Sequence, residues 1–314
     1  MGAFHEGEQV LQERTGVRER LAEVGAQFLR DYMPEQHREF FPLLPFIVAG
    51  SVDASGQPWA SVLAGPAGFV SSPDARTLSI ATRPHPVDPL AANVRVGAAM
   101  GLLGIQPHTR RRNRMNGHVT AMDERSFDLS VDQSFGNCPK YIRSREPRFI
   151  EGAQQPGTTT TMAALDEAAR ALVQGADTFF IATAHPRSRD SAAHEHGVDV
   201  SHRGGNPGFV RVDDSGRVLL FPDFTGNSYF NTIGNLLLEP RCGLVFIDFE
   251  SGTTLQVAAG AELVEDGAEL ASFRGALRLL RMEVTSALRV DHALPLRWTA
   301  GEPSPVLERT GTWS

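Results

Sequence analysis

The chain has 314 residues, 41% of them hydrophobic, and a formal net charge of −7 at pH 7. This length allows two ordinary domains or one large one, and the apolar content is enough for a buried core, which excludes a wholly disordered chain. The acidic balance argues against a surface built for nucleic acid or an anionic membrane, although a local basic cluster can still bind a small anion.

The cysteine content and the amino terminus bear on the compartment. Cys138 and Cys242 are too few for a disulfide framework or a zinc signature, and suit a reducing environment. The opening MGAFHEGEQV lacks the apolar run of a secretory signal, and no apolar stretch approaches the roughly 18–20 residues that span a bilayer. We therefore expect a soluble, cytoplasmic protein without nucleic-acid or membrane partners.

The first half begins with a helical segment and continues in short strands. Apolar residues at helical spacing predict a helix over 16–33, and Pro34 either ends this segment or starts a new one. Strands are expected near 44–49, 59–63 and 77–82, with turns at the DASG of 53–56 and the SPD of 72–74.

The second half follows the same plan. A helix is expected over Met162–Val173 and a strand over Phe179–Thr183. A hairpin is then predicted, with strands at 208–212 and 218–221 joined by the DDSG turn of 213–216. The next helix is expected over Tyr229–Leu238.

Residues 78–105 can be laid on residues 218–247, each with a strand, a polar loop containing proline, a helix ending near Asn93 or Asn235, and an apolar strand. A repeat of this length predicts two copies of one β-rich domain. The expected divisions are a helical segment (1–40), a first domain with its connection (41–150), a linker (151–161) and a second domain (162–314). At the carboxy terminus, Leu270–Leu288 has helical character, and 294–298 resembles a late strand or a packing arm.

Two stretches around the predicted hairpin could bind an anion. VSHRGGNPGFV (200–210) combines small residues with Ser201, His202 and Arg203, which offer hydrogen bonds and positive charge. PDFTGNSY (222–229) leaves a strand and enters a helix, where free N–H groups and the helix dipole favour a phosphate. The alternative is an ordinary glycine-rich turn followed by a capped helix.

Other polar segments allow both a functional and a structural interpretation. In FGNCPKYIR (135–143), Lys140 and Tyr141 could reach a bound anion or ring, or the segment could be a packed interdomain connection. The basic run HTRRRNR (108–114) could bind a phosphorylated substrate, but a solvated hairpin loop is the favoured interpretation.

The histidines at 185, 194, 196 and 202 lack the spacing of a metal motif such as H-E-x-x-H, so no metal is expected. The signatures of Rossmann, P-loop, G-x-S-x-G hydrolase and kinase proteins are absent from the sequence.

The order of these elements resembles the FMN-binding split barrel of pyridoxamine-5′-phosphate oxidase and its relatives. The resemblance is carried by DDSG (213–216), VLLFPDFTGN (218–227), SYFNTIGNLLLEPRCGLVFI (228–247) and TLQVAAGAELV (254–264), and more loosely by 74–86, 95–105 and 112–122. SHRGGNPGFV (201–210) and FGNCPKYI (135–142) are similar to segments of the flavin-nucleotide-binding branch. The implied fold is β-dominated α+β: two tandem split β-barrels with flanking helices, paired as an internal pseudo-dimer.

The resemblance also implies a set of cofactor-binding residues. Those expected to hold the FMN phosphate are Ser201, His202, Arg203, Asp223, Asn227 and Ser228. The family's usual Arg-Lys pair is replaced here by Ser228-Tyr229, and Gln256 falls where the family often places a polar residue facing the ring. The residues expected to complete the pocket from the first barrel and the connection are Trp59, Arg83, Asn113, Lys140 and Tyr141.

The implied function is an FMN-dependent oxidoreductase acting on a small molecule, with a nicotinamide or protein electron donor. His202 is the expected acid–base residue, because the pKa of histidine is near neutrality. The alternative is a non-catalytic protein that binds flavin, haem or a deazaflavin. This interpretation is compatible with either one or two FMN molecules per chain. It is also compatible with a homodimer.

Overall fold

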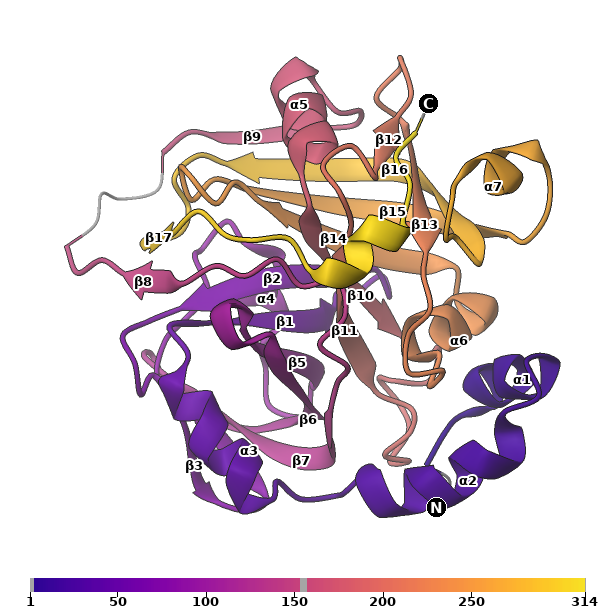
Figure 1. Ribbon diagram of the computed structural model, residues 1–314. Helices are drawn as coiled ribbons and strands as arrows, with labels where there is room; N and C mark the ends of the chain where they lie inside the picture. The colour runs from indigo at the N-terminus through magenta and orange to yellow at the C-terminus, as the bar shows by residue number, and fades with distance from the viewer. Residues whose placement is uncertain (1–2, 153–156, 314) are drawn as a thin grey trace.

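Two antiparallel sheets carry the fold, one from each half of the chain (Figure 1). The computed structural model describes residues 3–152 and 157–313. The first sheet has the order β2-β1-β5-β6-β7-β4-β3; the second has the order β11-β10-β14-β15-β16-β13-β12, with β9 paired to β16. The two paths have the same topology strand for strand. The expected fold of two tandem split β-barrels is confirmed.

The strands of the first sheet are β1 (Phe46–Val52), β2 (Pro58–Ala64), β3 (Val70–Asp74), β4 (Thr77–Ile80), β5 (Ala99–Gln106), β6 (Arg111–Met122) and β7 (Phe127–Gly136). Those of the second are β9 (Thr159–Met162), β10 (Thr178–Ala184), β11 (Val198–Gly204), β12 (Arg211–Val212), β13 (Val218–Asp223), β14 (Arg241–Ile247), β15 (Thr254–Val264) and β16 (Arg278–Val290). A separate two-stranded sheet pairs β8 (Pro147–Phe149) with β17 (Leu296–Trp298).

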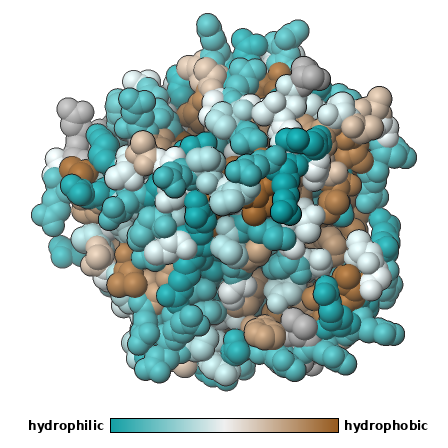
Figure 2. Space-filling model, in the orientation of Figure 1, coloured by the Kyte–Doolittle hydropathy of each residue, from teal (hydrophilic) through white to brown (hydrophobic). Residues whose placement is uncertain are grey.

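The helices lie around the sheets. They are α1 (Glu6–Arg14), α2 (Arg18–Phe28), α3 (Glu35–Phe40), α4 (Pro89–Asn93), α5 (Glu167–Gly175), α6 (Asn231–Leu238) and α7 (Ala268–Ser272), with 3₁₀ turns η1 (Phe41–Leu43), η2 (Pro107–Thr109) and η3 (Pro305–Arg309). On the face drawn in Figure 2, apolar side chains lie among many polar ones.

Three apolar clusters explain why the two halves stay together. One fills each barrel, and a third lies between them, with Phe46, Val48, Phe180 and Val245 among its members. β1 and β10 are buried on both faces, because one face packs inside its own barrel and the other packs against the partner half. This double burial accounts for their nearly continuous apolar sequences.

Two glycines let the sheets approach closely. A Cβ atom on Gly101 of β5 would lie 2.3 Å from the carbonyl oxygen of Val198 in β11. A Cβ atom on Gly243 of β14 would lie 2.4 Å from the carbonyl oxygen of Pro58 in β2. Gly101 pairs with Gly50, and Gly243 pairs with Ala182 at the corresponding place, so the two contacts are pseudo-symmetric.

The helix expected over Leu270–Leu288 is wrong. Only α7 is helical there, and β16 occupies 278–290 between β15 and β13. In the middle of that segment buried and exposed residues alternate, as in a strand, and its pairing with two neighbours overrides the local helical spacing.

Other boundaries differ for local reasons. The helix expected at 162–173 begins at Glu167, because Asp166 caps it, and Thr159–Met162 form β9 at the end of the expected linker. Part of that linker, 153–156, lies outside the described residues. The helix expected over 16–33 is replaced by α1 and α2, which a left-handed Gly16 (φ +68°) separates. The predicted hairpin is confirmed as β12–β13, and the late strand as β17.

The glycine contacts give a stability prediction. Gly101→Ala forces β5 away from β11, and we expect the free energy of unfolding to fall by about 2–3 kcal/mol, as for other overpacked interiors. Gly260→Ala in β15 is the matched control, because nothing lies within 4 Å of its Cβ position, and should change stability by about 0.5 kcal/mol or less. Urea unfolding measures both, and equal losses would contradict the close approach.

Candidate functional site

A cavity of about 350 Å³ lies between the two halves. Its walls come from the start of β6, from β11, from the end of β13 with the loop after it, and from the start of α6. The connection 137–141 and the junction of α1 with α2 complete it. This volume is within the range of small-molecule sites.

Strand alternation directs the basic side chains of β6 into the cavity. Arg112 and Arg114 line it, and Arg111 lies against the Phe40 ring and donates to the carbonyl of Gln36 instead. Because successive strand residues point to opposite faces, the two lining arginines share one face. The solvated loop favoured for 108–114 is therefore wrong for these two residues: Arg114 is only 2% exposed.

Carboxylates neutralise three of the arginines around the cavity. Arg114 is paired with Asp199 at 2.7 Å and donates to Ser201. Asp223 lies 2.6 Å from Arg203 and 3.7 Å from Arg278. Among the described residues, no carboxylate lies within ion-pair distance of Arg112 or Lys140. The cavity is therefore electropositive.

Arg112 lies against the backbone of the connection that follows β7. Its Nε donates to the carbonyl of Cys138 at 2.7 Å, and burial together with nearby Arg114 lowers the pKa of Arg112 to about 10. Buried nitrogens of three neighbouring arginines (Nε of Arg114 and Arg203, Nε and Nη1 of Arg278) make no hydrogen bond within the described structure. Buried donors of this kind are normally paired, and the guanidinium groups that carry them add positive charge to the cavity wall.

The start of α6 adds backbone donors to the same cavity. Ser228 and Phe230 both have left-handed backbones (φ +64°), and no side chain caps the helix. Its first N–H groups have no partner within the helix, and Asn231 and Thr232 line the cavity. Two non-glycine residues in this conformation cost of order 1–3 kcal/mol each, a type of strain that is concentrated at functional sites.

His202 lies in the wall between these groups. The pKa of His202 lies well below its usual value, mainly because the side chain is buried and also because the positive charges of Arg112 and Arg203 are nearby. Its imidazole is therefore neutral near pH 7, and the reason for choosing it as an acid–base residue, a pKa near neutrality, does not hold in this environment.

The structure brings together eight of the expected cofactor-binding residues and leaves four elsewhere. Those lining the cavity are Ser201, His202, Arg203, Asp223, Asn227, Ser228, Lys140 and Tyr141. Those away from it are Gln256, Trp59, Arg83 and Asn113. Gln256 donates to Ser61 and to the carbonyl of Ala60, and Trp59 donates to Asp53, so both side chains are engaged elsewhere.

The sequence analysis raised Arg112 and Arg114 only as part of a basic run that could bind a phosphorylated substrate, with a solvated loop favoured, and it missed Arg278 as a cavity residue. A signal existed for the first two: they alternate along a segment that continues into buried Met115, which is a strand pattern. Arg278 was not identified, because its segment had been interpreted as helical.

The N-terminal helix of the first half packs on α6 of the second half. A Cβ atom on Gly7 would lie 2.2 Å from the carbonyl oxygen of Gly234, so the two backbones touch. Buried Glu8 accepts from Asn231 at 2.5 Å, and burial raises the pKa of Glu8 well above its usual value. Gln12 donates to the carbonyl of Tyr229. α1 therefore fixes the turn that opens α6.

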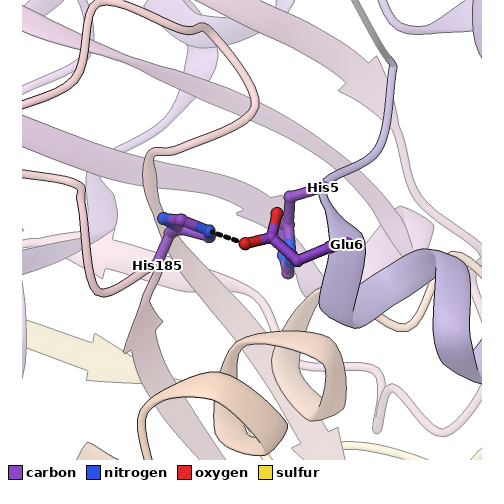
Figure 3. Close-up of side chains that lie close together, drawn as sticks. All are labelled: His5, Glu6 and His185. Carbon is purple, nitrogen blue, oxygen red and sulfur yellow. Dashed lines mark hydrogen bonds and ion pairs between the residues drawn. The ribbon is translucent and has the colours of Figure 1, made fainter.

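His5, Glu6 and His185 form a cluster at the start of α1 (Figure 3). Their potential ligand atoms lie within 4.8 Å of one another, and the His185 ring stacks on His196 at 4.0 Å. However, Nδ1 of His5 accepts from the Gly7 N–H, and Nδ1 of His185 accepts from the Arg187 N–H. In neutral rings the protons are then on Nε2, which suits His185 for donating to Glu6 and not for binding a metal.

Comparisons with known proteins agree with the tandem architecture. A profile of the pyridoxamine 5'-phosphate oxidase family matches residues 33–154 and 165–292. The chain belongs to this family. A search of curated proteins found no match. No helix in 3–152 or 157–313 has the length and apolar character needed to cross a membrane.

Solved structures resemble parts of the chain at low identity. A putative pyridoxamine 5'-phosphate oxidase from Lactobacillus delbrueckii is 18% identical over 43% of this chain and 98% of its own, with a TM-score of 0.30. An FMN-binding protein from Syntrophomonas wolfei is 11% identical over 39% and 84%, with a TM-score of 0.29. The heme storage protein HutZ from Vibrio cholerae is 17% identical over 41% and 95%, with a TM-score of 0.28.

The His5 environment predicts acid sensitivity. Burial lowers the pKa of His5 from 6.5 to about 4, so the folded state resists its protonation. Stability from this group is present above pH 6.5 and is lost as the pH falls from 6.5 towards 4, by about 2–3 kcal/mol. His5→Asn keeps an oxygen to cap α1 but cannot be protonated, so its unfolding free energy should fall less over this range.

Chemical denaturation at pH 7.5, 6, 5 and 4 measures the difference. His108→Asn, at an exposed position, is the control and should follow the unmodified protein. Parallel curves for the His5 variant and the unmodified protein would show that His5 is not held neutral.

Proposed function

We propose that the cavity between the two halves binds FMN, and that the chain is an FMN-dependent oxidoreductase acting on a small molecule. The observation that carries the proposal is Arg112, a cation lining the cavity with no carboxylate partner among the described residues, beside the uncapped start of α6. Together they offer a phosphate both side-chain and backbone donors.

The rest of the lining fits a flavin ring. Leu103, Phe209, Phe224 and Ile233 supply apolar surface, and Tyr141 stacks on Phe224 with the ring centres 5.1 Å apart. A ligand with a flat aromatic ring at one end and a phosphate at the other matches a cavity that has both kinds of wall. Membership in the pyridoxamine 5'-phosphate oxidase family supports FMN as that ligand.

When bound, FMN supplies the electron and hydride transfer. In this proposal Arg112, Arg114 and Arg203 hold the phosphate, while the α6 N–H groups orient it. Neutral His202 donates or accepts one hydrogen bond without carrying charge near pH 7, so its role is to position the ligand. The electron donor is a nicotinamide or a protein.

A second candidate is a non-catalytic protein that holds flavin, a deazaflavin or haem. The observation that favours haem is His202 itself, because a neutral imidazole in a cavity wall is suited to bind haem iron. Its position beside several arginines is equally suited to an anionic cofactor, so spectra are needed to separate the candidates.

Absorption spectra of the purified protein provide that separation. We expect flavin bands near about 370 and 450 nm and no Soret band. A Soret band would favour haem, and neither chromophore after incubation with FMN would contradict flavin binding. Oxidation of reduced nicotinamide in air by the flavin-loaded protein then separates an oxidoreductase from a carrier.

Adjacent arginines allow a matched test of the phosphate contact. Arg112→Gln removes a cavity cation that has no carboxylate partner, and we expect FMN affinity to fall about 10- to 100-fold. Riboflavin, which lacks the phosphate, should bind both forms equally. Arg111→Gln, on the opposite face of β6, is the control and should bind FMN like the unmodified protein. Equal loss of riboflavin and FMN in the Arg112 variant would contradict the proposed contact.

A further inference from the structure

The shared topology places a counterpart of the cavity in the first half. Gly101 of the first half corresponds to Gly243 of the second. From this pair, the strand registers show which residue of the first half corresponds to each residue that lines the cavity, and the reverse. Arg114 is opposite Leu103, and Gln256 is opposite Val245, so Arg114 corresponds to Gln256. By the same registers Arg112 corresponds to Thr254.

The other lining residues follow the same correspondence. Ser201 is opposite Ile181 and Ser61 is opposite Ala49, so these two serines correspond. His202 and Arg203 of the cavity then correspond to Val62 and Leu63. Beyond the ends of β7 and β16, the same residue count matches Lys140 and Tyr141 with Ala293 and Leu294, which line the counterpart of the cavity. Each basic residue in this set is replaced by a neutral one.

Conserved contacts show that the correspondence is structural. Asn235 donates to Thr183 at 3.2 Å, and Asn93 donates to Ser51 at 2.9 Å, at matching places in the two halves. Arg114 donates to Ser201, and Gln256 donates to Ser61. These matched hydrogen bonds place the counterpart of the cavity beside Gln256 and Ser61.

This counterpart is nearly closed. Its volume is about 40 Å³, against about 350 Å³ for the cavity, and Val62, Val87, Asp88, Val245, Thr254, Gln256, Val290, Ala293 and Leu294 line it with His85. A space of this size is far below the range of small-molecule sites.

The starts of α6 and α4 differ in the same way as the two spaces beside them: the first is open to an anion and the second is blocked. α6 begins without a side-chain cap, whereas α4 is capped by Asp88, whose Oδ1 accepts from the Leu90 N–H at 2.8 Å and from Ser61 at 2.5 Å. The Asp88 carboxyl group thus takes the hydrogen-bond donors that a bound anion would need. Burial raises the pKa of Asp88, as expected for an acid enclosed in this way.

We infer that the chain has one anion-binding cleft and one closed counterpart, sealed by Asp88, Gln256 and apolar residues, so that a full chain takes a single phosphate-bearing ligand. The first half serves the open cleft as a wall, through Arg112 and Arg114, and holds no ligand of its own. The flavin part of this inference rests on the proposed function, but the anion part does not.

Backbone amide spectra of the full chain test the two helix starts separately. Titration with inorganic phosphate should shift the Asn231 and Thr232 amides to saturation and leave Leu90 and Ala91 unchanged. Arg112→Thr introduces the residue type of Thr254, its counterpart in the closed cleft, and should weaken phosphate affinity at the α6 amides at least 10-fold. Arg111→Gln should leave that affinity unchanged. FMN titration should end at one equivalent per chain.

The outcomes separate this inference from the proposed function. A phosphate response at Asn231 and Thr232 alone, with no FMN binding, would sustain the inference and reject FMN. Two FMN equivalents, or phosphate shifts at Leu90 and Ala91, would overturn the inference. Absence of a phosphate response at both helix starts would also overturn it, because the α6 cleft is inferred to be open to anions.

Discussion

The close approach of the two sheets is the constraint on which the rest of the site depends. Gly101 lets β5 lie against the backbone of β11, and β6 is the neighbour of β5. This contact brings Arg114, on a strand of the first half, within 2.7 Å of Asp199 on a strand of the second. A larger residue at position 101 separates the strands that form the two main walls of the cavity.

Charge balance across that contact explains how so many arginines coexist. Asp199 accepts from Arg114, Asn116 and Asn235, so one carboxylate joins β6, β11 and α6. Asp223 accepts from Arg203 and lies 3.7 Å from Arg278, with which it makes an ion pair but no hydrogen bond. Buried charges are tolerated only when they are paired and hydrogen-bonded, and breaking one such pair is costly. Arg112 is left without a carboxylate, which makes it the arginine best suited to a ligand.

Much of the fold could be predicted from the sequence, because its signals are local. The DDSG turn of 213–216 fixes a hairpin, and the repeat of strand, polar loop, helix and strand around Asn93 and Asn235 indicates two copies of one topology. The wrong prediction at 270–288 has a tertiary cause: β16 pairs with both β13 and β15, and that pairing outweighs the helical character of the segment.

The site was less predictable, because its walls come from distant parts of the chain. The stretch around 201–203 and the loop to Ser228 were found from composition and helix-start chemistry. Gln256 was assigned to the cofactor through the family resemblance, but the register places it at the position of Arg114 in the other half. Only the pairing of strands shows which of two similar positions faces the open cavity.

The position of α1 has a consequence for synthesis of the protein. Glu8 and Asn231 are 223 residues apart in the chain, yet they form a buried hydrogen bond. The first helix is therefore synthesised long before α6, the helix on which it docks. Contacts of such long range slow folding, because the chain between the two residues must be ordered before they can meet.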